Sequence, residues 1–339
     1  MLRRREGLLA LAALWFAAPG RAAATALIQL FGKPAARVDR VFAAGPPAAV
    51  LLYVLAPERL LGWPMNLSDS ARALLAAPAR DRPVLGRLAG RGSTVGVEVL
   101  LKLQPDLILD AGTVDATYVS GAQRVAEQTG LPYALVDGRL ADSAQQLREV
   151  GALLGVGTRA ETLAVYAEQS LGVAAAARGA STAAWPGVYL ARGADGLETA
   201  LAGSINAEII EAAGGRNVAS VGRGGISRVS MEQVLAWAPD WIVTQDRGFF
   251  LQARTDALWS ALAAVRDGRV LLAPDQPFGW IDGPPGLNRL LGVRWLAAHL
   301  HAGQAGGFDA VAEAQRFYRL FYGVQPAREA LQAMLDGRG

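Results

Sequence analysis

The 339-residue sequence predicts an α/β protein of two lobes, each with a mostly parallel sheet flanked by helices, joined by a single long helix. Short apolar runs alternate with helical stretches of about ten residues, which is typical of βαβ units. A long helical stretch without proline lies near the middle of the chain, and a pattern in the first half returns in the second half. We therefore expect two similar α/β units on one connecting helix.

Residues 1–24 have the features of a secretory signal peptide. Residues 3–5 are arginines, residues 8–18 form a short apolar stretch, and residues 22–24 (Ala-Ala-Ala) form a small-residue cleavage site. The apolar stretch is shorter than the roughly 20 residues that a transmembrane helix needs, so a cleaved leader is favoured over a membrane anchor. We expect the mature protein in the periplasm.

The composition excludes several classes of protein. Hydrophobic residues make up 52% of the chain, which is enough for a buried core and excludes general disorder. Because the chain has no cysteine, disulfide scaffolds, thiolate metal sites and cysteine nucleophiles are excluded. The leader holds four of the 33 basic and one of the 30 acidic residues, so the mature chain keeps 29 of each. Such a neutral protein gives no reason to expect nucleic-acid binding.

The first lobe is expected at residues 25–156. Short apolar runs between loops rich in proline and glycine indicate buried strands, and Gly130 is expected to cap a helix C-terminus. The expected strands are 38–42, 106–109 and 132–136, and the expected helices are 96–103, 119–130 and 143–154.

The connecting helix is expected at 157–180, opened by a capping box from Thr158 to Glu161. The second lobe, at 181–305, repeats the alternation of strands and helices. Its expected strands are 187–190, 241–244 and 270–272, and its expected helices are 204–213, 230–237, 258–265 and 284–300. Residues 306–339 are expected to form two amphipathic helices, 308–322 and 327–335.

Two segments match each other across the lobes. Glu98 opens a short helix that ends before a Pro-Asp pair and a buried strand, and Glu232 opens a similar helix 134 residues later. A carboxylate in the first turn interacts favourably with the helix dipole, and Ser230 is expected as an N-cap with Gln233 as its capping-box partner. Ordinary helix capping is therefore one interpretation of both glutamates. The duplication favours a functional role, because two equivalent exposed acids on two lobes suit a two-point docking surface.

Together these features resemble the periplasmic substrate-binding proteins of ABC importers that serve iron-siderophores, haem and cobalamin. The resemblance covers essentially the whole mature chain and rests on the leader, residues 98–109, the helix from Thr158, residues 203–219 and residues 230–243 (SMEQVLAWAPDWIV). It implies lobes that close only slightly on a ligand held between them. It also implies that Glu98 and Glu232 dock onto arginines of a membrane permease dimer with its ATPase, and that the protein works as a monomer.

Five loops that follow strand ends are expected to line the cleft, because ligands of open α/β sheets bind beyond the carboxyl ends of the strands. The candidate ligand-binding residues are aromatic residues and arginines, namely Trp63, Tyr118, Arg192, Arg247, Phe249 and Trp280. Aromatic faces and guanidinium groups suit a bulky anionic chelate. Core packing is the alternative for Phe249 and Trp280, and a solvated surface position is the alternative for the two arginines.

The favoured ligand is a metal chelate, either an iron(III)-siderophore or a haem- or cobalamin-like molecule. A molybdate or tungstate oxyanion is the alternative, because free backbone amides near Pro284 and at Gly203–Ser204 offer an anion site. A bare metal ion fits poorly, since His299 and His301 are two positions apart on an expected helix and point to different faces. We therefore expect surface histidines and no metal site.

An enzyme is the less favoured class. The chain has no Gly-x-Ser-x-Gly, His-Glu-x-x-His or P-loop motif. Aspartates such as Asp110 and Asp282 do fall in the cleft loops, so the sequence alone leaves catalysis by a carboxylate pair open. We expect a binding protein without a cofactor.

Overall fold

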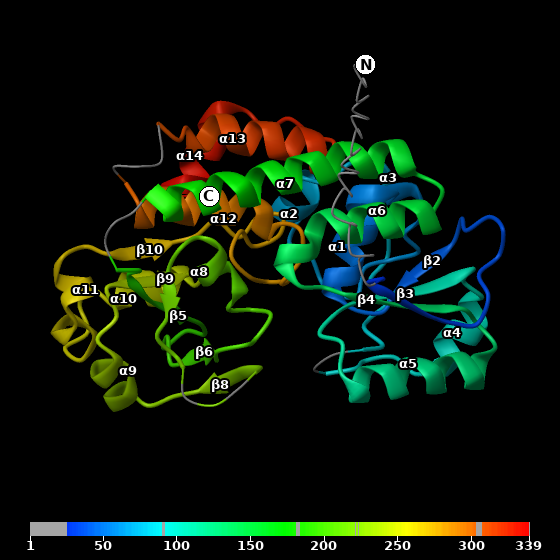
Figure 1. Ribbon diagram of the computed structural model, residues 1–339, viewed down its shortest axis with the longest axis horizontal. Helices are drawn as coiled ribbons and strands as arrows, with labels where there is room; N and C mark the ends of the chain where they lie inside the picture. The colour runs from blue at the N-terminus through cyan, green and yellow to red at the C-terminus, as the bar shows by residue number, and fades with distance from the viewer. Residues whose placement is uncertain are drawn as a thin grey trace, which may run out of the picture.

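The computed structural model describes residues 26–338 except 90–91, 181–183, 221, 223 and 303–306. The predicted signal peptide, residues 1–24, lies outside the described residues. Two α/β lobes lie side by side, and one long helix runs along both of them (Figure 1). The predicted fold class is confirmed.

The first lobe is built on a four-stranded sheet of order β1-β4-β3-β2, in which only β1 runs antiparallel to its neighbour. Helices cover its faces, so the central strand β3 is buried over almost its whole length. The strands are β1 (Ile28–Phe31), β2 (Val41–Ala43), β3 (Leu107–Gly112) and β4 (Tyr133–Asp137). The helices are α1 (Pro46–Leu55), η1 (Pro57–Arg59), α2 (Asp69–Ala73), α3 (Ala77–Arg80), α4 (Val97–Leu103), α5 (Ala116–Thr129), η2 (Leu140–Asp142) and α6 (Ser143–Leu153).

The second lobe has an all-parallel sheet of order β10-β9-β5-β7 and a separate antiparallel pair, β6 with β8. The strands are β5 (Gly187–Ala191), β6 (Glu198–Ala200), β7 (Arg216–Asn217), β8 (Ile226–Arg228), β9 (Trp241–Thr244) and β10 (Val270–Leu272). The helices are α8 (Glu208–Ala212), α9 (Met231–Trp237), α10 (Arg247–Gln252), η3 (Trp259–Ala261), α11 (Ala263–Arg266) and α12 (Arg289–Leu300). The C-terminal segment adds α13 (Ala310–Phe317), the π-helix η4 (Tyr318–Tyr322) and α14 (Arg328–Leu335).

Helix α7 (Gly157–Ala180) packs on α6 of the first lobe and on α12 of the second. Its residues are mostly good helix formers, and it contains no proline. The predicted capping box is wrong, because Thr158 lies within the helix and Glu161 instead pairs with Arg148 at 2.7 Å (Nε to Oε2). The limits of the lobes given above stay a prediction.

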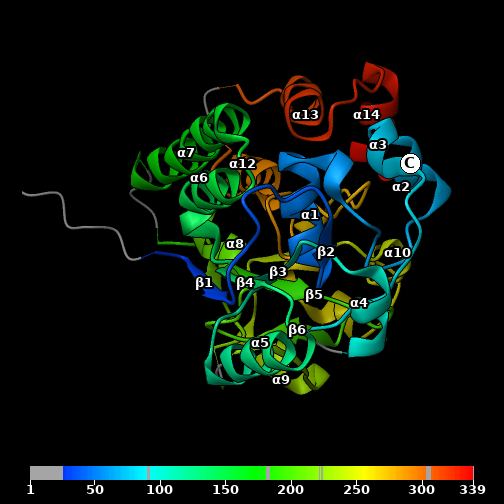
Figure 2. The same ribbon diagram turned by 90° about the vertical axis from the view of Figure 1, so that its right-hand side faces the viewer.

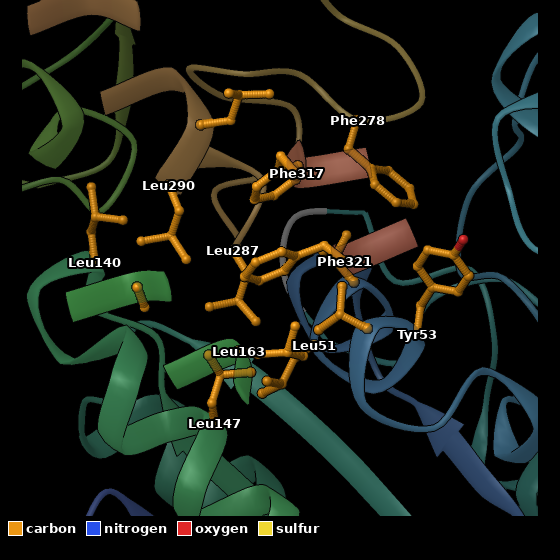
Figure 3. Packing of buried hydrophobic residues seen from close by; sticks show 14 of the residues in the cluster. Leu51, Tyr53, Leu140, Leu147, Leu163, Phe278, Leu287, Leu290, Phe317 and Phe321 are labelled. Carbon is orange, nitrogen blue, oxygen red and sulfur yellow. The ribbon is translucent and has the colours of Figure 1, made fainter. Parts of the chain in front are cut away.

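One hydrophobic core continues through both lobes. Figure 3 shows side chains of this core from the first lobe (Leu51, Leu140, Leu147), from α7 (Leu163) and from the second half of the chain (Leu287, Leu290, Phe317, Phe321) packed close together. The C-terminal segment returns to the first lobe, where the Tyr53 hydroxyl donates a hydrogen bond of 2.6 Å to the Tyr322 carbonyl. The two lobes therefore share their largest apolar cluster, while two smaller clusters, around Phe249 and around Ile108, each lie within one lobe.

Arg289 of α12 forms a buried polar link between the lobes. Its guanidinium is 1% exposed and donates to the carbonyls of Ile205 in the second lobe and Gly138 in the first, at 2.5 and 3.4 Å. Glu208 lies 3.5 Å from the same guanidinium and accepts a hydrogen bond of 2.8 Å from the Leu140 amide. Burial raises the pKa of Glu208 and lowers that of Arg289. This network fixes the second lobe against the end of β4.

Several expected helices have different limits. The helix expected from Pro284 begins only at Arg289, because the Asn288 side chain donates to the carbonyls of Gly279 and Pro284 and holds this segment in bends. The helix expected at 258–265 is divided at Leu262 into η3 and α11, and the one expected at 204–213 shortens to α8. Helix 308–322 becomes a π-helix at Tyr318.

His301 is buried, so its expected surface position is wrong. It lies beside Gly214, where a Cβ atom would come within 2.5 Å of its Nε2 atom, and the glycine thus makes room for the imidazole. His299 donates a hydrogen bond of 2.8 Å from Nδ1 to the Trp295 carbonyl and contacts the Trp295 ring. Within the described ranges, no three acidic or histidine side chains gather as a metal site would require.

None of the helices that the structure describes combines the length and apolar character needed to cross a membrane.

Candidate functional site

A cavity of about 650 Å³ lies between the lobes. Four of the five predicted cleft loops contribute to its lining, namely those after β2, β3, β5 and β10. The fifth, after β9, does not, because α10 starts at Arg247 and turns Phe249 into the core. The site thus lies beyond the carboxyl ends of strands from both sheets, as expected for open α/β folds.

Rigid apolar surface makes up much of the lining. Five prolines border the cavity: Pro46, Pro47, Pro277, Pro284 and Pro285. Pro46 and Pro47 are the first two residues of α1 and have no N–H groups, so this helix start presents hydrocarbon instead of amide donors. Such a wall suits a ligand with a large apolar face.

The helix start expected at Pro284, on which the predicted anion site depends, lies at Arg289 instead. Because the helix begins at Arg289, the amides of its first turn already donate to carbonyls of residues 286–288, at 3.1–3.3 Å. Ser204, from the second predicted anion site, does line the cavity, but its hydroxyl is engaged with Asn206. The first-turn amides of α12, on which the oxyanion alternative near Pro284 depended, are therefore occupied.

The first-lobe wall contains a buried carboxyl group, Asp110. It is 6% exposed and accepts hydrogen bonds of 2.9 Å from the Tyr133 hydroxyl and from the Ala111 amide. Burial raises the pKa of Asp110, and these hydrogen bonds oppose the shift only in part. Asp110 therefore holds its proton to a higher pH than an exposed aspartate does, and a protonated carboxyl group can donate a hydrogen bond to a ligand.

The second-lobe wall is formed by an arginine held in place by Asp282. Arg192 follows β5 directly, and its guanidinium forms an ion pair with Asp282, whose side chain is 7% exposed. The Asp282 carboxylate also accepts hydrogen bonds of 2.8 Å from the Asn206 side chain and the Gly283 amide. Arg192 lies 3.6 Å from Glu198 as well, and its side chain remains 28% exposed at the cavity. The guanidinium is thus oriented toward the cavity before any ligand arrives.

Tyr118 and Arg87 also line the cavity on the first lobe, together with the smaller polar residues Asn66, Ser68 and Thr113. Asp115 caps α5 and accepts a hydrogen bond of 3.0 Å from the Tyr118 amide, which fixes Tyr118 in the first turn of that helix. Asp275 lies opposite, on the second lobe, where burial raises its pKa. The cavity combines two arginines, a tyrosine and apolar walls, which can bind an anionic molecule with an extended face.

The structure brings together two of the six predicted ligand-binding residues, Tyr118 and Arg192. Arg247 is an exposed residue at the start of α10, outside the cavity lining. Its predicted role is not supported by its position.

The three remaining aromatic residues lie in the hydrophobic core instead. Trp63 is fully buried and donates a hydrogen bond of 2.9 Å from Nε1 to the Ala79 carbonyl. Phe249 and Trp280 are each 1% exposed, and Phe249 packs edge-on against Trp259 with 4.7 Å between ring centroids. Side chains so enclosed have no free face for a ligand, so these predictions are corrected.

Sequence reasoning underestimated the polar residues of the cavity. Asp110 and Asp282 were recognised only as possible catalytic carboxylates, and Asn206 and Arg87 were not recognised as candidates at all. Asn206 follows a glycine-serine turn, and Arg87 lies in a glycine-rich segment, GRLAGRG. Polar residues in such glycine-containing turns were the signal that could have identified them.

The two predicted docking acids are exposed on equivalent helices. Glu98 lies in the first turn of α4 and Glu232 in the first turn of α9, and the predicted Ser230–Gln233 capping box of α9 is present. A hydrogen bond from Ser230 holds the pKa of Glu232 below its ordinary value. Figures 1 and 2 both place α4 and α9 on the side of the molecule away from α7.

Comparison with known proteins links the chain to solute binding. The family model described as "Periplasmic binding protein" matches residues 77–277. A molybdate-binding protein of Haemophilus influenzae is 33% identical over 129 residues, which are 37% of this chain and 36% of that protein. The match thus spans about a third of the length of this curated relative.

Solved structures show the same architecture. An ABC transporter solute binding protein from Sulfurospirillum deleyianum superposes with a TM-score of 0.81 at 26% identity, over 89% of this chain and 95% of that one. The molybdate-bound Haemophilus influenzae protein gives 0.68 at 22% identity, over 87% and 96%. A periplasmic haem-binding protein from Pseudomonas aeruginosa gives 0.59 at 23% identity, over 79% and 94%. The last two likenesses concern the fold alone.

Proposed function

Because the chain belongs to the periplasmic binding protein family, whose members bind solutes and are not enzymes, we propose that it captures a metal chelate between its lobes. The chelate class is an iron(III)-siderophore or a haem- or cobalamin-like molecule. The protein then delivers this ligand to an ABC permease in the membrane.

The size of the cavity is the observation on which the choice of ligand rests. A volume of about 650 Å³ falls in the range of roughly 300–1,000 Å³ found for sites of drug-sized ligands. A five-atom oxyanion would leave most of this space filled with water. The five prolines of the lining present apolar surface, while Arg192 and Tyr118 supply a guanidinium and an aromatic ring for an anionic chelate.

Molybdate is the second candidate, favoured by the 33% identical segment shared with the molybdate-binding relative. Arg192, Asn206 and Ser204 line the second-lobe wall, where a small oxyanion would replace their present contacts with Asp282 and with each other. This candidate requires the lobes to close farther around the ligand than a chelate would require.

Isothermal titration of the mature chain distinguishes the two ligands. A ferric hydroxamate, a ferric catecholate, haemin, cobalamin, molybdate and tungstate are titrated separately. We expect saturable binding of at least one chelate at micromolar concentration or below. Binding of molybdate or tungstate alone would replace the chelate assignment, and no binding of any compound would contradict both.

Two arginine variants localise the binding site. Arg192→Ala is expected to weaken binding of the chelate at least tenfold, because a charge-assisted contact contributes about 1.5–3 kcal/mol. Arg247→Ala is the matched control, since Arg247 lies on the same lobe but outside the cavity lining. Equal affinities for both variants would place the ligand elsewhere.

Delivery depends on docking through Glu98 and Glu232, one acid on each lobe. Charge reversal of both residues is expected to reduce uptake of the chelate while the affinity of the protein for the chelate in solution stays unchanged. The control reverses Glu211 and Glu329, two exposed acids on α8 and α14, and produces the same change in net charge. Unchanged uptake by the Glu98/Glu232 double variant would refute the docking role.

A further inference from the structure

Helices α4 and α9 are structurally equivalent beyond their shared glutamate. Each has seven residues, and each ends at a residue in the left-handed conformation, Gln104 (φ 46°) and Ala238 (φ 42°). These are the two residues other than glycine with positive φ among those the structure describes. A side chain with a Cβ atom disfavours this conformation, so both helix ends are held there by surrounding contacts.

The same pair of hydrogen bonds, made by an aspartate, follows each helix. After Gln104, Asp106 donates a backbone hydrogen bond of 2.8 Å to the Arg40 carbonyl and accepts one of 2.8 Å at its carboxylate from the Arg40 amide. After Ala238, Asp240 makes the same pair of bonds with Gly187, at 2.8 and 2.6 Å. Each pair of hydrogen bonds links the end of its helix to the start of a sheet strand, β2 or β5. The orientation of the helix relative to the sheet is thereby fixed.

Both helices present an exposed leucine at the same position. Leu101 is 50% exposed and Leu235 is 37% exposed. Each lies three residues after its glutamate, so acid and leucine share one side of the helix. The leucines are separated by the same 134 residues as the glutamates, and neither belongs to the hydrophobic core clusters.

We propose that Leu101 and Leu235 are apolar docking contacts for the permease, each acting beside its glutamate. This inference rests on the proposed function and defines the partner more closely. The fitting partner presents, twice, an arginine next to an apolar recess, as the two subunits of a permease dimer would. An exposed ion pair alone contributes little to the binding free energy. Burial of the neighbouring leucine in the interface supplies the binding free energy that the ion pair does not.

The test measures docking of the ligand-free protein, so that it does not depend on the identity of the ligand. The cognate permease–ATPase complex is immobilised in nanodiscs, and the dissociation constant is measured by surface plasmon resonance. The double variant Leu101→Ala/Leu235→Ala is expected to bind about tenfold more weakly, because two half-exposed leucines lose their burial. Alanine is the best helix former, so both helices remain intact.

The matched control is Val165→Ala/Val173→Ala. These valines are 40% and 48% exposed on α7, on the other side of the molecule (Figure 1). Their docking constant is expected to stay within twofold of the native value. A comparable loss in this control would overturn the inference, because the effect would then not belong to α4 and α9.

The docking constant of the double variant Glu98→Lys/Glu232→Lys is measured in the same way. Its comparison with the leucine variant separates failure of this inference from failure of the proposed function. Native docking by the leucine variant together with lost docking by the glutamate variant would overturn the leucine contacts alone. Lost docking by the leucine variant and native docking by the glutamate variant would support the leucines and refute the acids. No docking by the native protein would overturn both. Raising the salt concentration should weaken the glutamate contribution and leave the leucine contribution unchanged.

Discussion

The ion pair between Arg192 and Asp282 gives the sharpest stability prediction for the candidate site. Asp282 has three partners around its carboxylate: Arg192, the Asn206 side chain and the Gly283 amide. Replacement by asparagine removes the negative charge but keeps the shape of the side chain. Arg192, with a side chain 28% exposed, then loses its main counter-ion and keeps only Glu198, at 3.6 Å.

The size of the effect follows from the burial of the pair. A hydrogen bond to a charged group contributes about 1.5–3 kcal/mol, and fully exposed ion pairs contribute below about 1 kcal/mol. Because Arg192 is partly exposed and Glu198 compensates in part, we expect a coupling energy near the lower value, about 1.5 kcal/mol. Asp282→Asn should also weaken chelate binding about tenfold, since the guanidinium is no longer held toward the cavity.

A double-mutant cycle measures this coupling. The native protein, Arg192→Gln, Asp282→Asn and the double variant are unfolded in urea, and the four free energies of unfolding are compared. Additivity of the single effects within about 0.5 kcal/mol would refute the reasoning, because it would show that the two groups do not interact. Chelate affinity equal to the native value in Asp282→Asn would show that Asp282 does not position Arg192.

Three further predictions concern the interior. Leu163→Ala in the shared core should lower the free energy of unfolding by about 2–5 kcal/mol, measured in urea, and a loss below about 1 kcal/mol would contradict its full burial. Arg289→Met should cost about 3–5 kcal/mol because Glu208 stays behind without its cation, and Arg289→Met/Glu208→Gln should recover part of this loss. The contribution of Asp110 to stability is present below the ordinary pKa of 3.8 and is lost as pH rises through its higher folded-state pKa. Asp110→Asn should therefore gain stability relative to the native protein as pH rises above 3.8, and a difference independent of pH would contradict the shift.

Local sequence signals were sufficient for much of the fold. The strand at Trp241–Thr244 and the Ser230–Gln233 capping box were correctly predicted, since both depend on residues a few positions apart. The start of α12 was not, because it depends on Asn288 reaching back to the Gly279 carbonyl. Such contacts form only after the chain has folded.

In the candidate site, too, local features were predicted and contacts between distant residues were not. Arg192 was predicted because it follows a strand directly, but its partner Asp282 lies 90 residues away and was not predicted as such. Trp63 was expected in the cleft because proline follows it in a short apolar segment. Its burial depends on Phe278, which arrives from the other half of the chain with 5.8 Å between ring centroids.

The apolar interior common to both lobes has a consequence for fragments of this protein. If the chain were severed after α7, each piece would expose a bare face of Leu, Phe and Ala side chains to water. Neither fragment would then be a self-sufficient module. The two fragments, expressed together, would instead be soluble only after they had reassembled into one complex.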